Sequence, residues 1–275
     1  MKYVKYGIMT LFLISIIIYI AIWYKDKSNV DSTVPVIQMS QNQIEVSVKD
    51  KKALLKGVIA KDAKDGDITN KIVVESISKF VDKKEHICNV TYAVSNSGGH
   101  VAKASRKVKF IDYTSPRFVL KKPLCLETGS DTGVEEIIGA KDIIDGDISN
   151  KVKILSRDIS TNISGDNTVT AQVTNSLGDT VKLKATVIIK QQNNISPTIQ
   201  LKKNIEYIKK DEEFDAKSFI KSVEDIDGKS MEIGSVKIKS SSVKTNKVGC
   251  YTVEYSVVDH NGNEGTAYLT VMVEE

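Results

Sequence analysis

The segment YTVEYSVVDHNGN, residues 251–263, contains the pattern that decides the fold of this chain. Its first seven residues alternate between aromatic or β-branched side chains and polar ones. Alternation with a period of two predicts a β-strand with one buried face. Asp259 and Gly262 then predict a hairpin turn, because Asp bonds its own backbone and Gly accepts a positive φ. The segment therefore indicates a strand that turns back on itself.

The same strand-and-turn pattern occurs twice more. CNVTYAV, residues 88–94, leads into NSGGH, and TVTAQV, residues 168–173, leads into NSLGD. In both turns a glycine follows an asparagine by three positions. A second alternating stretch closes each unit, and its expected inner rows include Val181, Leu183, Ala185, Val187 and Ile189, and later Ala267, Leu269, Val271 and Val273. We therefore predict one such hairpin in each third of the chain.

Prolines mark the beginning of each unit. Pro35, Pro116 and Pro197 each follow a short polar run and precede the next alternating segment, at equal spacing. Proline suits the first residue of a strand because it lacks an N–H group and has a fixed φ. Units of about 80 residues are too long for solenoid repeats and match independent β-sandwiches. We predict an all-β protein with domains at residues 31–113, 114–193 and 194–275, which short linkers should align end to end.

An aspartate-rich segment of twelve residues is repeated in the first two units, as AKDAKDGDITNK at 60–71 and AKDIIDGDISNK at 140–151. One interpretation is a turn whose Asp side chains bond nearby N–H groups. The other is a calcium site, because Ca²⁺ takes six to eight oxygen ligands. EF-hand spacing is excluded by Lys61 and Ala63. The candidate metal ligands are Asp62, Asp65, Asp67, Asp142, Asp145 and Asp147.

The third unit keeps only part of this motif, in the segment EDIDGK at 224–229. It offers Glu224, Asp225 and Asp227, but Lys229 stands where the other units have Asp67 and Asp147. A cation site that relies on that last carboxylate would be lost in the third unit, whereas a turn would survive. The turn is the favoured interpretation, and it predicts folding without calcium.

Residues 1–30 predict a short cytoplasmic tail and a membrane anchor. Residues 7–23 carry no charge, and tyrosine and tryptophan residues flank this apolar run as in an interfacial belt. Lys2 and Lys5 precede the run, so residues 31–275 should lie outside the cell. Cleavage as a signal peptide is the alternative, but bulky Trp23 and Tyr24 occupy the place of the small residues that cleavage requires. A pilin-type leader would need Glu where Phe12 stands.

The charge distribution argues against a nucleic-acid partner. The chain has a net charge of +4. Residues 1–30 contain four lysines and one aspartate, so they carry most of this charge, and the remaining 245 residues have a net charge of only +1. Nucleic-acid binding requires a basic patch, which this interspersed pattern of Lys and Asp or Glu does not provide.

No arrangement in the sequence indicates catalysis. His86, His100 and His260 are far apart, and two of them fall in equivalent turns. The sequence contains no C-x-x-C, no P-loop and no dinucleotide fingerprint. We therefore predict no enzyme activity and no cofactor other than possible calcium. One cysteine occurs in each third of the chain, which predicts free thiols rather than a disulfide framework: Cys88, Cys125 and Cys250.

These motifs resemble a known family. A-x-D-x-x-DGDI[TS] at 60–69 and Y-x-V-x-Y-x-V-x-D-x-x-GN at 251–263 are similar to the bacterial immunoglobulin-like domains of pesticidal crystal proteins and many bacterial surface proteins. The resemblance covers residues 33–275. The middle unit departs from it, because Ala171 replaces the tyrosine found at Tyr92 and Tyr255. The resemblance implies three tandem immunoglobulin-like β-sandwiches behind one transmembrane helix.

The family resemblance also implies a function. Such domains build extracellular stalks and adhesins and share no enzymatic activity. We expect a single-pass membrane protein, anchored through residues 7–23, whose extracellular domains bind a surface protein or a cell-wall polysaccharide. The alternative is a dedicated carbohydrate- or cell-wall-binding module, which the low aromatic content of 6% disfavours.

Overall fold

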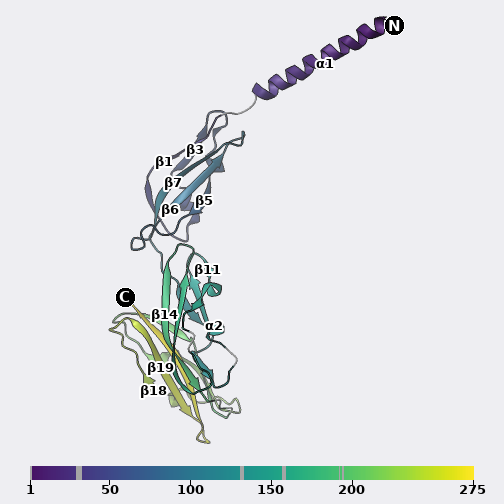
Figure 1. Cartoon of the computed structure of the whole chain (residues 1–275). Coiled ribbons are helices and arrows are strands. Elements are labelled where there is room, and N and C mark those ends of the chain that lie inside the picture. The colour runs from purple at the N-terminus through teal and green to yellow at the C-terminus, as the bar shows by residue number, and fades with distance from the viewer. Residues whose placement is uncertain (1, 29–32, 131–132, 157–158, 192, 194) are drawn as a thin grey trace. The chain divides into compact units, whose positions relative to one another are not determined.

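The computed structural model describes residues 2–28, 33–130, 133–156, 159–191, 193 and 195–275 (Figure 1). The chain divides into two compact units, residues 1–112 and 113–275. Asp112 accepts hydrogen bonds from Ser47 and Val48 of the first unit, whereas Tyr113 donates to Asp179 of the second. The limits 31–113, 114–193 and 194–275 stay the proposed domain boundaries.

Helix α1 (Lys2–Ser28) opens the first unit. Its segment Ile8–Lys25 has a mean hydropathy of 2.0, and none of that segment is buried against the rest of the protein. A helix of this length and composition can cross a membrane, since about 20 apolar residues span the hydrocarbon core.

The first sandwich has a three-stranded and a four-stranded sheet. The smaller sheet has the order β1-β3-β4 and the larger β2-β7-β6-β5, with only the β2–β7 pair parallel. Its strands are β1 (Val36–Met39), β2 (Gln43–Val46), β3 (Val58–Asp62), β4 (Gly66–Asp67), β5 (Val73–Ile77), β6 (Ile87–Ser95) and β7 (Val101–Phe110), with 3₁₀ helices η1 (Lys51–Leu55) and η2 (Thr69–Lys71).

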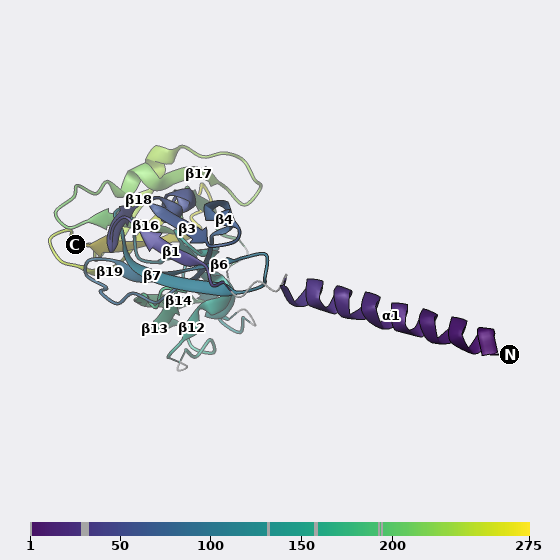
Figure 2. The same cartoon turned by 90° about the horizontal axis from the view of Figure 1, so that it is seen from above.

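The second sandwich repeats this strand order as β11-β10-β8 and β12-β13-β14-β9. Strands β12, β13 and β14 lie in one region of Figure 2. Its elements are β8 (Arg117–Leu120), β9 (Cys125–Glu127), α2 (Val134–Ile137), β10 (Ile138–Asp142), β11 (Gly146–Asp147), η3 (Ser149–Lys151), β12 (Lys153–Ile154), β13 (Gly165–Thr174) and β14 (Thr180–Lys190).

The third sandwich has the sheets β15-β17 and β16-β20-β19-β18, and a single bridge from Glu224 to Ser230 stands in the place of β4 and β11. Its elements are β15 (Thr198–Leu201), β16 (Ile205–Lys209), η4 (Ala216–Phe219), β17 (Ile220–Glu224), η5 (Ile233–Ser235), β18 (Lys237–Ser241), β19 (Gly249–Val258) and β20 (Glu264–Glu274). The structure is therefore an all-β protein of three immunoglobulin-like sandwiches behind one apolar helix.

The three hairpins that the sequence predicts are the longest strand pairs of the structure: β6–β7, β13–β14 and β19–β20. Their predicted inner residues are buried, except Val181, which is half-buried. The turn glycines Gly99, Gly178 and Gly262 have φ values of 81°, 76° and 86°, and each donates its N–H to the carbonyl three residues earlier. The spacing predicted the turns because only glycine adopts this conformation without strain.

A tyrosine inside the first and third sandwiches is replaced by alanine in the second. The hydroxyls of Tyr92 and Tyr255 donate to the carbonyls of Leu54 and Ala216 at 2.6 and 2.7 Å. Across the hairpin both tyrosines face alanines, Ala104 and Ala267, whereas Ala171 faces Leu183. The large and small residues have exchanged strands, which keeps the core filled.

The expected end-to-end alignment is wrong for the second and third sandwiches. Ile205, Cys250 and Met272 of the third pack against the core of the second. Glu274, the last residue of β20, forms an ion pair of 2.6 Å with Arg117 at the start of the second sandwich. The two sandwiches therefore lie side by side within residues 113–275 (Figure 1). The physical reason is that Cys250 and Met272, on the outer face of β19 and β20, add apolar area that the second sandwich covers.

Candidate functional site: the aspartate loops

The aspartate loops are two-residue ladders at the edge of the smaller sheets. In the first, Lys61 pairs with Asp67 and Asp62 with Gly66, and the second repeats this register. Gly66 and Gly146 have φ values of 72° and 75°, and a side chain at either position would meet open space. Glycine is therefore required for its backbone conformation and not for lack of room.

Asp62 is buried and organises the first loop. Its carboxylate accepts hydrogen bonds from the N–H groups of Lys64 and Asp65 at 3.0 Å, from the Thr33 hydroxyl at 2.9 Å and from Asn96 Nδ2 at 3.2 Å. These donors, led by the Asp65 N–H, lower the pKa of Asp62 to about 2. Hydrogen bonds to the charged form of a carboxylate favour that form.

Asp142 repeats this role in the second loop. It accepts from the N–H groups of Ile144 and Asp145 at 2.9 Å and from Asn175 Nδ2 at 3.0 Å. The same asparagine amide also donates to the Tyr113 hydroxyl at 2.8 Å. The loop is thus joined to residue 113, where the second compact unit begins.

Asp65 and Asp145 join each loop to the neighbouring hairpin turn. Asp65 accepts from both the N–H and the hydroxyl of Ser97 at 2.6 Å, and Asp145 accepts from Ser176 at 2.8 and 2.6 Å. The Ser97 hydroxyl is the main cause of a lowered pKa at Asp65. An ion pair with Lys151, at 2.9 Å, adds to the contacts of Asp145.

Asp67 and Asp147 begin the next helical turn. Each accepts from the N–H of the residue two positions later, Thr69 or Ser149, at 2.9 Å. The hydroxyls of Thr69 and Ser149 are the main cause of the lowered pKa of these two carboxyls. The next residue in each case, Ile68 or Ile148, is buried. The three aspartates of a loop therefore have three separate hydrogen-bonding roles.

The third loop is built differently. Asp225 accepts from the N–H groups of Asp227 and Lys229 at 3.0 and 2.8 Å. The nearby hairpin turn has Asp259 in place of asparagine, and this carboxylate accepts from Asn261 and Asn263. In the third sandwich, each of these two carboxylates thus accepts hydrogen bonds from N–H groups of its own turn.

These loops can hold the backbone in place, and their carboxylates face protein donors. Within the part of the chain that the structure describes, no three His, Cys, Asp or Glu side chains converge as a metal-binding group. Calcium binding by Asp62, Asp65, Asp67, Asp142, Asp145 and Asp147 stays a prediction.

Sequence reasoning missed the partners of these aspartates. Asn96 and Ser97, with their counterparts Asn175 and Ser176, supply the donors that close each loop. A signal was present, because the Asn-Ser dipeptide occurs only in the two units that carry Asp-Gly-Asp in full. The third unit changes both motifs together.

The remaining polar candidates lie apart from one another. His100 is half-buried in the first hairpin turn, and His260 is exposed in the third. All three cysteines are free. Burial raises the pKa of the Cys88 thiol to about 11 and that of Cys250 to about 12, which makes both poor nucleophiles.

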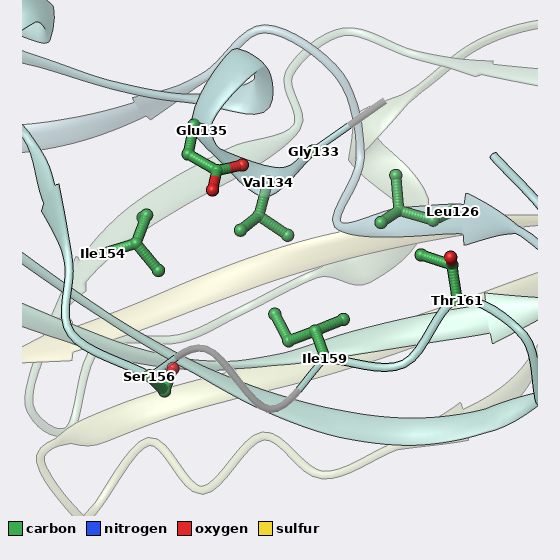
Figure 3. Close-up of a pocket in the computed structure, with 8 residues that line it drawn as sticks. All are labelled: Leu126, Gly133, Val134, Glu135, Ile154, Ser156, Ile159 and Thr161. Atoms are coloured by element: carbon green, nitrogen blue, oxygen red, sulfur yellow. The ribbon is translucent and has the colours of Figure 1, made fainter. Parts of the chain in front are cut away.

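A cleft of about 490 Å³ opens in the second sandwich (Figure 3). Apolar side chains from β9, α2, β12 and the loop after it form its walls, with Glu135 at one side. Ser156 also lines the cleft. Its hydroxyl accepts a hydrogen bond from the Thr170 N–H and donates one to the Thr168 carbonyl, so it is bonded to backbone groups of β13. The residues that line the cleft are Leu126, Gly133, Val134, Glu135, Ile154, Ser156, Ile159 and Thr161.

Comparison with known proteins identifies the sandwich type. Residues 199–273 match the model of a family described as bacterial surface protein, Ig-like domain. The chain is 25% identical over 222 residues to the pesticidal crystal protein Cry22Aa of Bacillus thuringiensis. It is 31% identical over 138 residues to an uncharacterized 81.3 kDa protein of Acholeplasma phage L2. These matches cover 78% and 50% of this chain but only 29% and 18% of the two relatives.

Two solved structures are similar to this chain at low TM-scores. One contains the M60 catalytic domain with two CBM51 domains of Clostridium perfringens ZmpB, with 16% identity, a TM-score of 0.25, and coverage of 89% of this chain and 31% of that one. Another contains cadherin domains 3–6 of protocadherin gamma B2, with 12% identity, a TM-score of 0.23, and coverage of 87% and 73%. From the family match, the resemblance read from the sequence is confirmed, and the chain carries a bacterial surface immunoglobulin-like domain at residues 199–273.

Proposed function

We propose that this protein is a membrane-anchored surface protein whose immunoglobulin-like sandwiches act outside the cell as a non-catalytic stalk or interaction module. The observation that carries the proposal is the apolar helix Ile8–Lys25, whose side chains contact no core, placed before sandwiches of which one matches a bacterial surface family. An unburied apolar helix of this length is stable in lipid and costly in water.

Support for a non-catalytic role comes from the polar groups. The buried carboxylates of Asp62 and Asp142 accept hydrogen bonds from backbone N–H groups and asparagine amides. The Ser156 hydroxyl donates to one backbone group and accepts from another. Nucleophilic catalysis needs a nucleophile and a base in mutual contact. The repeated loops instead serve each sandwich as a structural unit.

The proposed partner is another surface protein, with a cell-wall polysaccharide as the alternative. Sugar rings are bound by stacking on exposed aromatic faces. Every tyrosine and phenylalanine in residues 33–275 is buried or half-buried in the part that the structure describes. This distribution favours a protein partner over a carbohydrate.

The test is a topology experiment on the full-length protein in bacterial protoplasts. Added protease should remove residues 33–275 and leave a membrane-bound fragment, because Lys2 and Lys5 hold the short tail inside. Protection of the whole chain would show that the sandwiches face the cytoplasm. Recovery of an intact soluble form, shortened at its N-terminus, would show a cleaved signal peptide instead.

A further inference from the structure

We propose that the second and third sandwiches are one folding and mechanical body, locked through the outer faces of their larger sheets. The contact brings β14 of the second sandwich, with β8 and β9, against β16, β19 and β20 of the third. It goes beyond the proposed function, since it holds wherever the protein is located.

The first observation is that β20 is buried on both faces. Tyr268 and Thr270, which point away from the core of the third sandwich, are only 9% and 4% exposed. The two hairpins can be aligned on the alanine that faces each tyrosine, Ala104 in the first sandwich and Ala267 in the third. In this alignment Ser105 and Lys107 of the first sandwich correspond to Tyr268 and Thr270. Ser105 and Lys107 are exposed. The third sandwich thus has apolar or small side chains where a solvent face has lysine and serine.

The second observation is what covers this face. Cys250 and Met272 share a cleft with Lys182 and Lys184 of β14. Farther along the same strands, Thr252 and Glu254 share another cleft with β14 residues that include Ile188. β14 and β19 are in direct contact, as Figure 1 shows. Ile188 and Met272 both occupy the strand position of Lys109 in the first sandwich.

The third observation is a set of polar contacts at the edge of the interface. Arg117 forms an ion pair with Glu274 and lies over the ring of Tyr207 at 4.8 Å. The Tyr207 hydroxyl donates to the Phe118 carbonyl, and Asn204 Nδ2 donates to the Leu120 carbonyl, both at 3.1 Å. Such bonds fix the register of two surfaces that apolar contact alone would let slide.

Two cysteines report on this interface. Cys250 lies within it, and Cys125 of β9 is half-buried near Glu254, whose charge adds to the rise in thiol pKa that burial causes. Cys88, buried in the first sandwich, is an internal reference. If two sandwiches open together, a destabilising change in one must expose the thiol of the other.

The experiment measures alkylation rates of the three thiols in the full-length protein under native conditions. Val253→Ala opens a cavity in the third sandwich, and Val90→Ala makes the same change at the equivalent position of the first. With Val253→Ala we expect both Cys250 and Cys125 to react about tenfold faster, with Cys88 unchanged. With Val90→Ala only Cys88 should react faster.

A second variant separates the two bodies. Met272→Lys installs the residue that the first sandwich carries at this strand position, so β20 itself tolerates it while the interface does not. Met272→Lys alone should expose both Cys125 and Cys250, since both lie at the interface. Adding Val253→Ala should then accelerate Cys250 further and leave Cys125 at the rate that it has in Met272→Lys alone. The proposal is overturned if Val253→Ala accelerates Cys250 alone. It is also overturned if Arg117→Ala and Met272→Lys each leave Cys125 and Cys250 as protected as before.

Discussion

Asp62 shows at the level of a single residue how a repeated acidic motif holds the backbone of a loop. Its carboxylate is the acceptor on which two backbone N–H groups, a hydroxyl and an amide converge. Four donors around one buried carboxylate stabilise its charged form. The charge is therefore part of the fold of this loop, and protonation should weaken it.

A pH titration tests this role. The folded-state pKa of Asp62 is about 2, below the ordinary value of 3.8. Because the folded pKa is the lower one, the contribution of Asp62 to stability is complete above about pH 4 and is lost as the pH falls toward 2. Denaturant unfolding of the full-length protein, followed by circular dichroism, should become easier across this window. In Asp62→Asn that part of the pH dependence should disappear, and its persistence would assign it to other carboxyls.

Whether the protein binds calcium also depends on the aspartates of these loops. The aspartates of the first two loops are already engaged with protein donors, so we expect the thermal midpoint to be the same with calcium and with a chelator. Calorimetry of the full chain measures this directly. The third sandwich is the matched control, because it has Lys229 in place of the last aspartate. A calcium-dependent rise in the first two sandwiches alone would make those aspartates ligands.

At the scale of elements, the hairpin is the unit that each sandwich shares. The paired strands differ in which one carries the large side chain. In the first and third sandwiches a tyrosine of the first strand faces an alanine of the second: Tyr92 faces Ala104, and Tyr255 faces Ala267. In the second sandwich Ala171 of the first strand faces Leu183 of the second. The volume of the pair is held, while its orientation is reversed. Two strands of a hairpin are therefore one packing unit rather than two.

A double-mutant cycle tests this coupling. Ala171→Tyr alone should overpack the second sandwich and cost about 1–3 kcal/mol of unfolding free energy. Leu183→Ala alone should leave a cavity and cost about 2–5 kcal/mol. The double variant should cost clearly less than the two losses added together, since the tyrosine fills the space that leucine vacates. Denaturant unfolding measures all three, and strict additivity would show that the residues pack independently.

At the scale of the whole molecule, the proposed function puts the apolar helix in lipid and the sandwiches in water. Ile17 lies in the middle of the uncharged run, and Tyr24 lies at its end. A charge at the centre of a membrane helix costs about 2.5–3.5 kcal/mol on insertion scales, and much less near the interface. We expect Ile17→Arg to reduce the membrane-bound fraction of the full-length protein, and Tyr24→Arg to leave it nearly unchanged. Cell fractionation with immunoblotting measures the fraction. Equal retention of both variants would show that the helix does not span the bilayer.

Much of the fold was determined by the sequence alone, because its causes are local. Alternation with a period of two fixed the strands of each hairpin and their buried faces. Glycine at positions such as 99 and 262 fixed the turns, since other residues resist a positive φ. The role of Asp67 was also local, because its partner is two residues away. The apolar run of residues 7–23 predicted a helix of membrane-spanning length by the same kind of reasoning.

Only the tertiary structure decided which distant groups meet. Asp65 and Ser97 are 32 positions apart, and Arg117 and Glu274 are 157 apart, so no periodicity links them. Alternation gives each strand two faces but does not say whether the second face meets water or another sandwich. For Lys107 that face is solvent, and for Thr270 it is buried. The physical reason is that burial of an outer face depends on what a neighbouring domain presents to it, and that is set by contacts between sandwiches.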